Sequence, residues 1–178
     1  MLETFIRLVT LIPRPIGRAI VAPLRILPGF RHAMRVMNYV REIDKLEDDS
    51  DFQAARALRQ KSLNDVPARY SAPLWRSEGF DRLRFGNPVE ALEAFEIGIG
   101  HLEGSAAMVG LSRPDELYYG AAWAALDAGE LQKARGYYRR AANSVTAIRR
   151  FVKLPEEPRW FTEGLATLRR RLGEPTRA

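Results

Sequence analysis

The chain has 178 residues, of which 46% are hydrophobic, which is enough apolar material for one helical domain or a short solenoid. It has no cysteine and two histidines without partner carboxylates at ligand spacing, which excludes disulfides and thiolate metal sites and gives no indication of a histidine site. The net charge of +6 is concentrated in basic ends: residues 1–35 hold six arginines against one glutamate, and residues 131–178 hold twelve basic against four acidic residues. No uncharged stretch approaches the roughly 20 residues of a membrane span, and no signal peptide is recognisable.

Residues 1–29 form a separate segment that is rich in arginine, proline and large apolar side chains. Four of the eleven prolines lie here and divide it into short helices. Arginines on one side and apolar residues on the other predict contact with an anionic membrane surface. Docking on a partner protein and packing against the chain's own core are the alternatives. The residues that carry this prediction are Arg7, Arg14, Arg18, Arg25, Ile16, Ile20, Leu24 and Leu27.

Beyond this segment, apolar residues recur at three- and four-residue steps, and no stretch alternates as a strand does. The fold class is therefore all-α, with antiparallel helix pairs joined by short turns. Glycine, proline and acidic residues set the helix boundaries. The expected helices cover residues 30–48, 51–63, 71–85, 88–102, 114–128, 130–152 and 156–172, with a longer linker at 104–113.

Two of these helix pairs share one spacing of small and aromatic residues. A glycine at the turn is followed five positions later by alanine and four positions further by an aromatic residue: Gly86, Ala91 and Phe95 in the first pair, Gly129, Ala134 and Tyr138 in the second. Small residues let helices approach closely, and the aromatic side chain fills the space beside them. This pattern resembles the tetratricopeptide repeat.

A third and degenerate repeat covers residues 36–67. Ser50 stands at the position of the turn glycine, and Arg59 stands at the position of the aromatic residue. The resemblance implies a short, right-handed solenoid over residues 30–153, with residues 154–178 as a capping helix and tail.

The resemblance also implies a concave groove, lined by the first helix of each pair, that holds a peptide. The matching positions of the first pair are Val40, Asp44 and Glu47. In the second and third pairs, the predicted groove residues are Arg76, Phe80, Leu83, Arg84, Tyr119, Trp123 and Leu126. With two arginines on one helix face, an acidic segment is a candidate ligand.

No nucleophile–base set, phosphate loop or dinucleotide fingerprint is present in the sequence. We therefore expect a cytoplasmic, non-catalytic scaffold or adaptor without cofactor or metal, which binds a protein or peptide partner and attaches peripherally to a membrane through its N-terminal segment. The oligomeric state is left open.

RNA binding by the arginine-rich C-terminal third is the alternative function, because basic residues interleaved with aromatic rings suit a nucleic-acid strand. Its residues are Arg139, Arg140, Arg149, Arg150, Arg169, Arg170 and Arg171, with Tyr137 and Tyr138.

Overall fold

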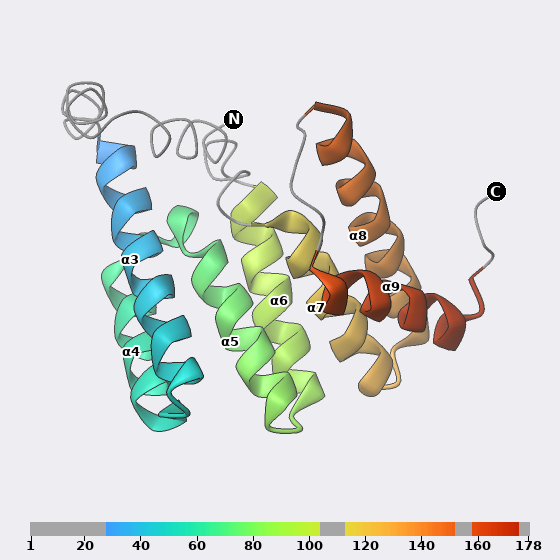
Figure 1. Cartoon of the computed structure of the whole chain (residues 1–178), viewed down its shortest axis with the longest axis horizontal. Coiled ribbons are helices and arrows are strands. Elements are labelled where there is room, and N and C mark those ends of the chain that lie inside the picture. Colours follow the sequence, from blue (N-terminus) through green and yellow to red (C-terminus); the bar gives the residue numbers. More distant parts are fainter. Residues whose placement is uncertain (1–27, 104–112, 152–157, 175–178) are drawn as a thin grey trace.

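The computed structural model describes residues 28–103, 113–151 and 158–174, and this part of the chain contains seven α-helices, one short 3₁₀ helix and no strand (Figure 1). The prediction of an all-helical fold is confirmed for these residues. In chain order the elements are α3 (Pro28–Asp48), α4 (Phe52–Asp65), η1 (Ala68–Tyr70), α5 (Ala72–Arg84), α6 (Pro88–Glu103), α7 (Pro114–Asp127), α8 (Leu131–Phe151) and α9 (Arg159–Leu172).

Consecutive helices pack as three antiparallel pairs, α3 with α4, α5 with α6 and α7 with α8 (Figure 1). The first members of the pairs, which we call the leading helices, are also in contact, because α5 touches both α3 and α7. Helix α9 lies across α7 and α8 and contacts both of them. Three leading helices and α9 are thereby brought together from separate segments of the chain.

The tight turns inside the three pairs have one geometry. Ser50, Gly86 and Gly129 have positive φ angles of 62°, 77° and 81°. In each turn this residue donates its amide hydrogen to the carbonyl three residues earlier, and the next amide donates to the carbonyl five residues earlier. These two hydrogen bonds satisfy carbonyl groups in the last turn of the leading helix. The first pair thus makes the same turn with serine that the other two make with glycine.

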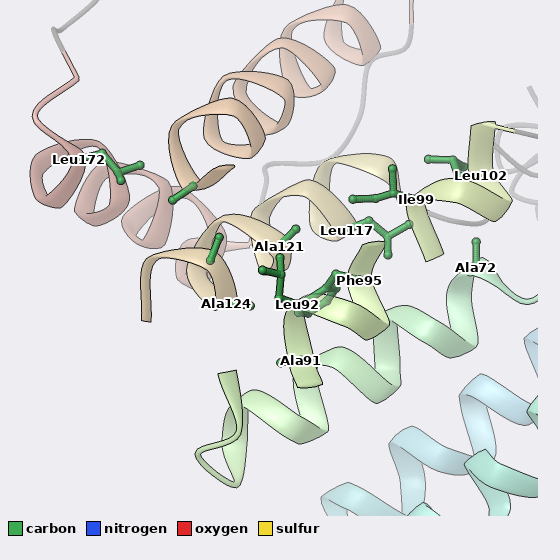
Figure 2. Packing of buried hydrophobic residues seen from close by; sticks show 12 residues of the cluster. Ala72, Ala91, Leu92, Phe95, Ile99, Leu102, Leu117, Ala121, Ala124 and Leu172 are labelled. Carbon is green, nitrogen blue, oxygen red and sulfur yellow. The ribbon is translucent and has the colours of Figure 1, made fainter. Parts of the chain in front are cut away.

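A cluster of small and apolar side chains joins the second pair to the third (Figure 2). Phe95 of α6 is fully buried at its centre, between Gly79 of α5 and Gly120 of α7. A Cβ atom on Gly79 would come within 2.6 Å of the Phe95 ring, and one on Gly120 would overlap that ring. The two glycines therefore permit the close approach of α5 and α7 to one aromatic side chain.

Arg59 of α4 takes the corresponding place between α3 and α5, and its side chain is fully buried. Its Nη2 lies 2.6 Å from Glu47 Oε1 of α3, and its Nη1 lies 3.4 Å from Asp81 Oδ2 and 3.5 Å from Glu78 Oε2 of α5. Its Nε also donates a hydrogen bond of 3.1 Å to Ser77 Oγ. The residue that departs from the repeat spacing thus helps to join the first pair to the second.

We predict that Ser50→Gly raises the free energy of unfolding by about 1 kcal/mol, because a non-glycine residue in the left-handed region costs roughly 1–2 kcal/mol. The helix cap is retained in this variant, since Asp51 Oδ1 accepts the hydrogen bond from the Ala54 amide at 3.1 Å. Urea unfolding followed by circular dichroism measures the change.

The matched control is Gly129→Ser, which should lower stability by a similar amount. No atom lies within 4 Å of a Cβ built on Gly129, so only the backbone conformation is tested. A Ser50→Gly variant that is no more stable than the natural chain would contradict the equivalence of the turns.

Candidate functional site

An open groove of about 690 Å³ is formed by the three leading helices and α9. Helices α3, α5 and α7 contribute eleven of its lining residues, and α9 contributes one. The groove is lined by Asp44, Glu47, Arg76, Ser77, Phe80, Leu83, Arg84, Glu116, Tyr119, Trp123, Asp127 and Trp160.

The structure brings most of the sequence-predicted groove residues to this one surface: Asp44, Glu47, Arg76, Phe80, Leu83, Arg84, Tyr119 and Trp123. Two others lie elsewhere. Leu126 packs half-buried against the clusters between α7, α8 and α9, and Val40 packs in the cluster between α3 and α4. Both side chains are half-buried in these clusters and are not part of the groove lining, so their role in the groove stays a prediction.

The two arginines of the groove are already paired within the protein. Arg76 Nη1 lies 2.9 Å from Glu116 Oε2, and Arg84 Nη2 lies 2.8 Å from Glu47 Oε2. The lining carries four carboxylates and only these two guanidinium groups. A ligand carboxylate would have to displace an internal one, so the groove's charge does not favour the acidic ligand expected from the sequence.

Asp44 differs from the other carboxylates of the groove. Its side chain makes no hydrogen bond or ion pair with the described residues. Partial burial raises the pKa of Asp44, although the nearby Arg76 guanidinium acts in the opposite direction. Because burial disfavours the ionised form, a cation bound near Asp44 would stabilise its carboxylate.

At the α9 end, the groove wall is aromatic. The Tyr119 ring centroid lies 6.4 Å from that of Trp123 and 5.7 Å from that of Trp160, both in edge-to-face orientation. Phe161 lies beneath, 5.0 Å from Tyr119, and burial raises the pKa of the Tyr119 hydroxyl. Trp160 is 50% exposed, so its ring offers apolar surface to a ligand.

Four lining residues were not predicted from the sequence. Glu116 and Asp127 share the helical spacing of Tyr119 and Trp123, so the periodicity of α7 contained the signal that identifies them. Ser77 of α5 and Trp160 of α9 are the other two. Trp160 lies off the apolar stripe of α9, and nothing in local spacing shows that α9 reaches this surface.

Arginines of α8 contact the C-terminal end of α9, and one of them, Arg139, belongs to the set that the sequence suggests for RNA binding. Arg135 donates two hydrogen bonds of 3.2 and 3.3 Å to the Leu172 carbonyl, and Arg139 Nη2 lies 2.9 Å from Glu174 Oε1. Such contacts occupy cations that would otherwise be available to phosphates.

The remaining arginines of that set divide into three groups. Arg140 lies over the Tyr118 ring, and Arg171 pairs with Asp127. Arg169 and Arg170 are on α9, where Arg170 donates to Thr167 Oγ1. The side chains of Arg149 and Arg150 lie outside the described residues. The geometry therefore gives the groove more support than RNA binding.

The prediction for the N-terminal segment concerns residues 1–29, of which 1–27 lie outside the described part of the chain. None of the described helices combines the length and the apolar composition that crossing a membrane requires. Among the described residues, no three His, Asp or Glu side chains are grouped in a way that could hold a metal ion.

Comparison of the chain with protein-family models, with curated proteins and with solved structures finds no match. The functional assignment below therefore rests on the groove itself.

Proposed function

We propose that the protein is a non-catalytic interaction module, built as a short solenoid similar to tetratricopeptide repeats, whose groove binds a segment of a partner protein. The observation that carries this proposal is that three leading helices from separate parts of the chain line one groove. Such a surface suits a scaffold or adaptor, because a protein of this kind binds its partner without changing the partner chemically.

The repeated architecture has support from two sets of equivalent positions. The turn residues Ser50, Gly86 and Gly129 share one backbone conformation and one hydrogen-bond pattern. Arg59 and Phe95 each lie between two leading helices. Helix α9 packs on the last pair and acts as the cap of the solenoid.

The chemistry of the groove suits binding better than catalysis. Its aromatic end offers anchoring surface, and the surrounding charges are mostly neutralised in ion pairs, as in protein interfaces. A catalytic site requires an acid, base or nucleophile arranged around a reacting atom. Three of the four carboxylates of the groove, Glu47, Glu116 and Asp127, instead form ion pairs with arginines of the same chain.

We predict that Trp160→Ala weakens peptide binding about tenfold, because exposed aromatic residues beside a pocket are frequent energetic hot spots. Short random peptides displayed on phage supply the ligands, and fluorescence anisotropy measures their affinity. Trp160 is half-exposed, so the fold should tolerate its loss.

The control is Val89→Ala, which removes a side chain that is 65% exposed on α6, outside the groove. Equal affinities of the two variants would contradict binding at the aromatic end. Failure of any peptide to bind the unaltered protein would contradict the proposed function.

We further propose that residues 1–29 attach the protein to the cytoplasmic face of a membrane. The segment combines four arginines with closely spaced large apolar residues and has one acidic residue. Each arginine near an anionic surface contributes on the order of 1 kcal/mol, and the apolar side chains add their burial in the interface.

We predict that the full chain floats with liposomes containing anionic lipid, whereas a chain that begins at Pro28, where α3 starts, stays in the soluble fraction. Neutral liposomes should bind the full chain less well, because the arginines then lose their partners. Flotation of both chains to the same extent would contradict the proposal. Aggregation of the shortened chain would instead show that the segment covers the protein's own core.

A further inference from the structure

We propose that the ligand of the groove carries an arginine whose guanidinium binds between Trp123 and Asp127, in a seat that Arg171 of the same chain occupies in the free protein. This inference rests on the proposed function, because it names the chemistry of the partner segment that the groove would bind.

The seat is visible in the contacts of Arg171. Its guanidinium carbon lies 5.3 Å from the centroid of the Trp123 ring, and its Nη1 lies 3.4 Å from Asp127 Oδ1. Trp123 and Asp127 are one helical turn apart on α7, so an aromatic face and a carboxylate are presented side by side. This pair suits a planar cation, which stacks on the ring and donates hydrogen bonds to the carboxylate.

Arg171 is held in a way that permits exchange. Its side chain is 49% exposed and that of Asp127 is 43% exposed, and ion pairs this exposed to water contribute little. The separation of 3.4 Å also exceeds the 2.7–2.9 Å of a strong charged hydrogen bond. Arg171 belongs to the last turn of α9, whereas Trp123 and Asp127 line the groove. A ligand in the groove therefore reaches the same two groups from the open side.

The remaining charges select a basic ligand. Arg76 and Arg84, the two cations of the lining, are held by Glu116 and Glu47. Asp44 forms no hydrogen bond or ion pair with the described residues and contributes a carboxyl group at the other end of the groove. Charge complementarity therefore favours a segment with an arginine and, next to it, an apolar side chain that can lie on Trp160.

The role of Arg171 as an internal occupant has a consequence that a purely structural role lacks. When an internal group occupies a site, the apparent affinity for a ligand falls in proportion to the fraction of protein molecules in which the site is free. Removing the Arg171 guanidinium should therefore strengthen binding, whereas removing the charge of Asp127 should weaken it.

The test uses the full chain and the tightest-binding phage-selected peptide with one fixed arginine, compared with the same peptide carrying citrulline, the neutral isostere of arginine. Fluorescence anisotropy should show binding about tenfold tighter for the arginine peptide, since a charged stack and ion pair are lost in citrulline. Arg171→Gln should tighten binding of the arginine peptide about three- to tenfold, and Asp127→Asn should weaken it by a similar factor.

Arg170→Gln is the matched control, because Arg170 lies on the same helix and donates only to Thr167 Oγ1 within α9. The Arg170→Gln variant should bind the arginine peptide with the same affinity as the unaltered chain. If Arg171→Gln detaches α9, which hydrogen exchange over residues 159–172 would show, the two peptides on the unaltered chain decide the question. Equal affinity for the arginine and citrulline peptides overturns this inference.

The inference and the proposed function fail in different ways. Suppose that peptides bind the unaltered chain and lose affinity with Trp160→Ala, but show no preference for arginine. The groove then remains the binding site, and only the arginine seat is overturned. If the peptides selected at this surface are acidic, the arginine seat is likewise overturned and the groove remains the binding site. Absence of any binding that depends on Trp160 overturns both.

Discussion

The buried guanidinium of Arg59 is the constraint on which the groove depends. This side chain of α4 reaches α3 through Glu47 and α5 through Glu78 and Asp81. Burying an arginine is costly unless carboxylates compensate it, and removing one partner of such a group costs about 3–5 kcal/mol. Three carboxylates converge here, and Arg56 and Arg82 complete the cluster by pairing with Asp81 and Glu78. The first helix pair is thus fixed to the second by charge rather than by apolar burial alone.

Glu47 connects this buried ion-pair cluster to the groove. One oxygen of Glu47 binds the buried Arg59, and its other oxygen binds Arg84 on the groove surface. Phe95 makes the next junction with a different chemistry, since an aromatic ring there packs against two glycines. Both junctions set the separation of neighbouring leading helices, so they also set which side chains face the groove. At the far end, arginines of α8 bind the C-terminal end of α9, and Trp160 at its N-terminal end packs against Tyr119 in the aromatic wall.

Local spacing in the sequence was sufficient for the helices, the turns and most of the groove. Helical periodicity places Arg76, Phe80, Tyr119 and Trp123 on the inner faces of α5 and α7, and the structure brings those faces together. Arg59 is a mismatch to the repeat spacing, and nothing near it in sequence shows that three carboxylates converge on it from two other helices. The pairing of Arg76 with Glu116 was missed for the same reason. Long-range ion pairs depend on which helices become neighbours, and this information is absent from the spacing within one helix.

The indole groups of the three tryptophans provide the most direct test of the groove as the binding surface. Trp123 and Trp160 line the groove, whereas the Cβ of Trp75 faces Gly98 of α6, outside the groove lining. Each indole N–H gives its own signal in a nitrogen–proton correlation spectrum, so a titration with a selected peptide reports on all three positions at once. Binding in the groove predicts progressive shifts of the Trp123 and Trp160 signals with little change at Trp75. A peptide that binds while Trp123 and Trp160 stay unchanged would contradict the groove as the site.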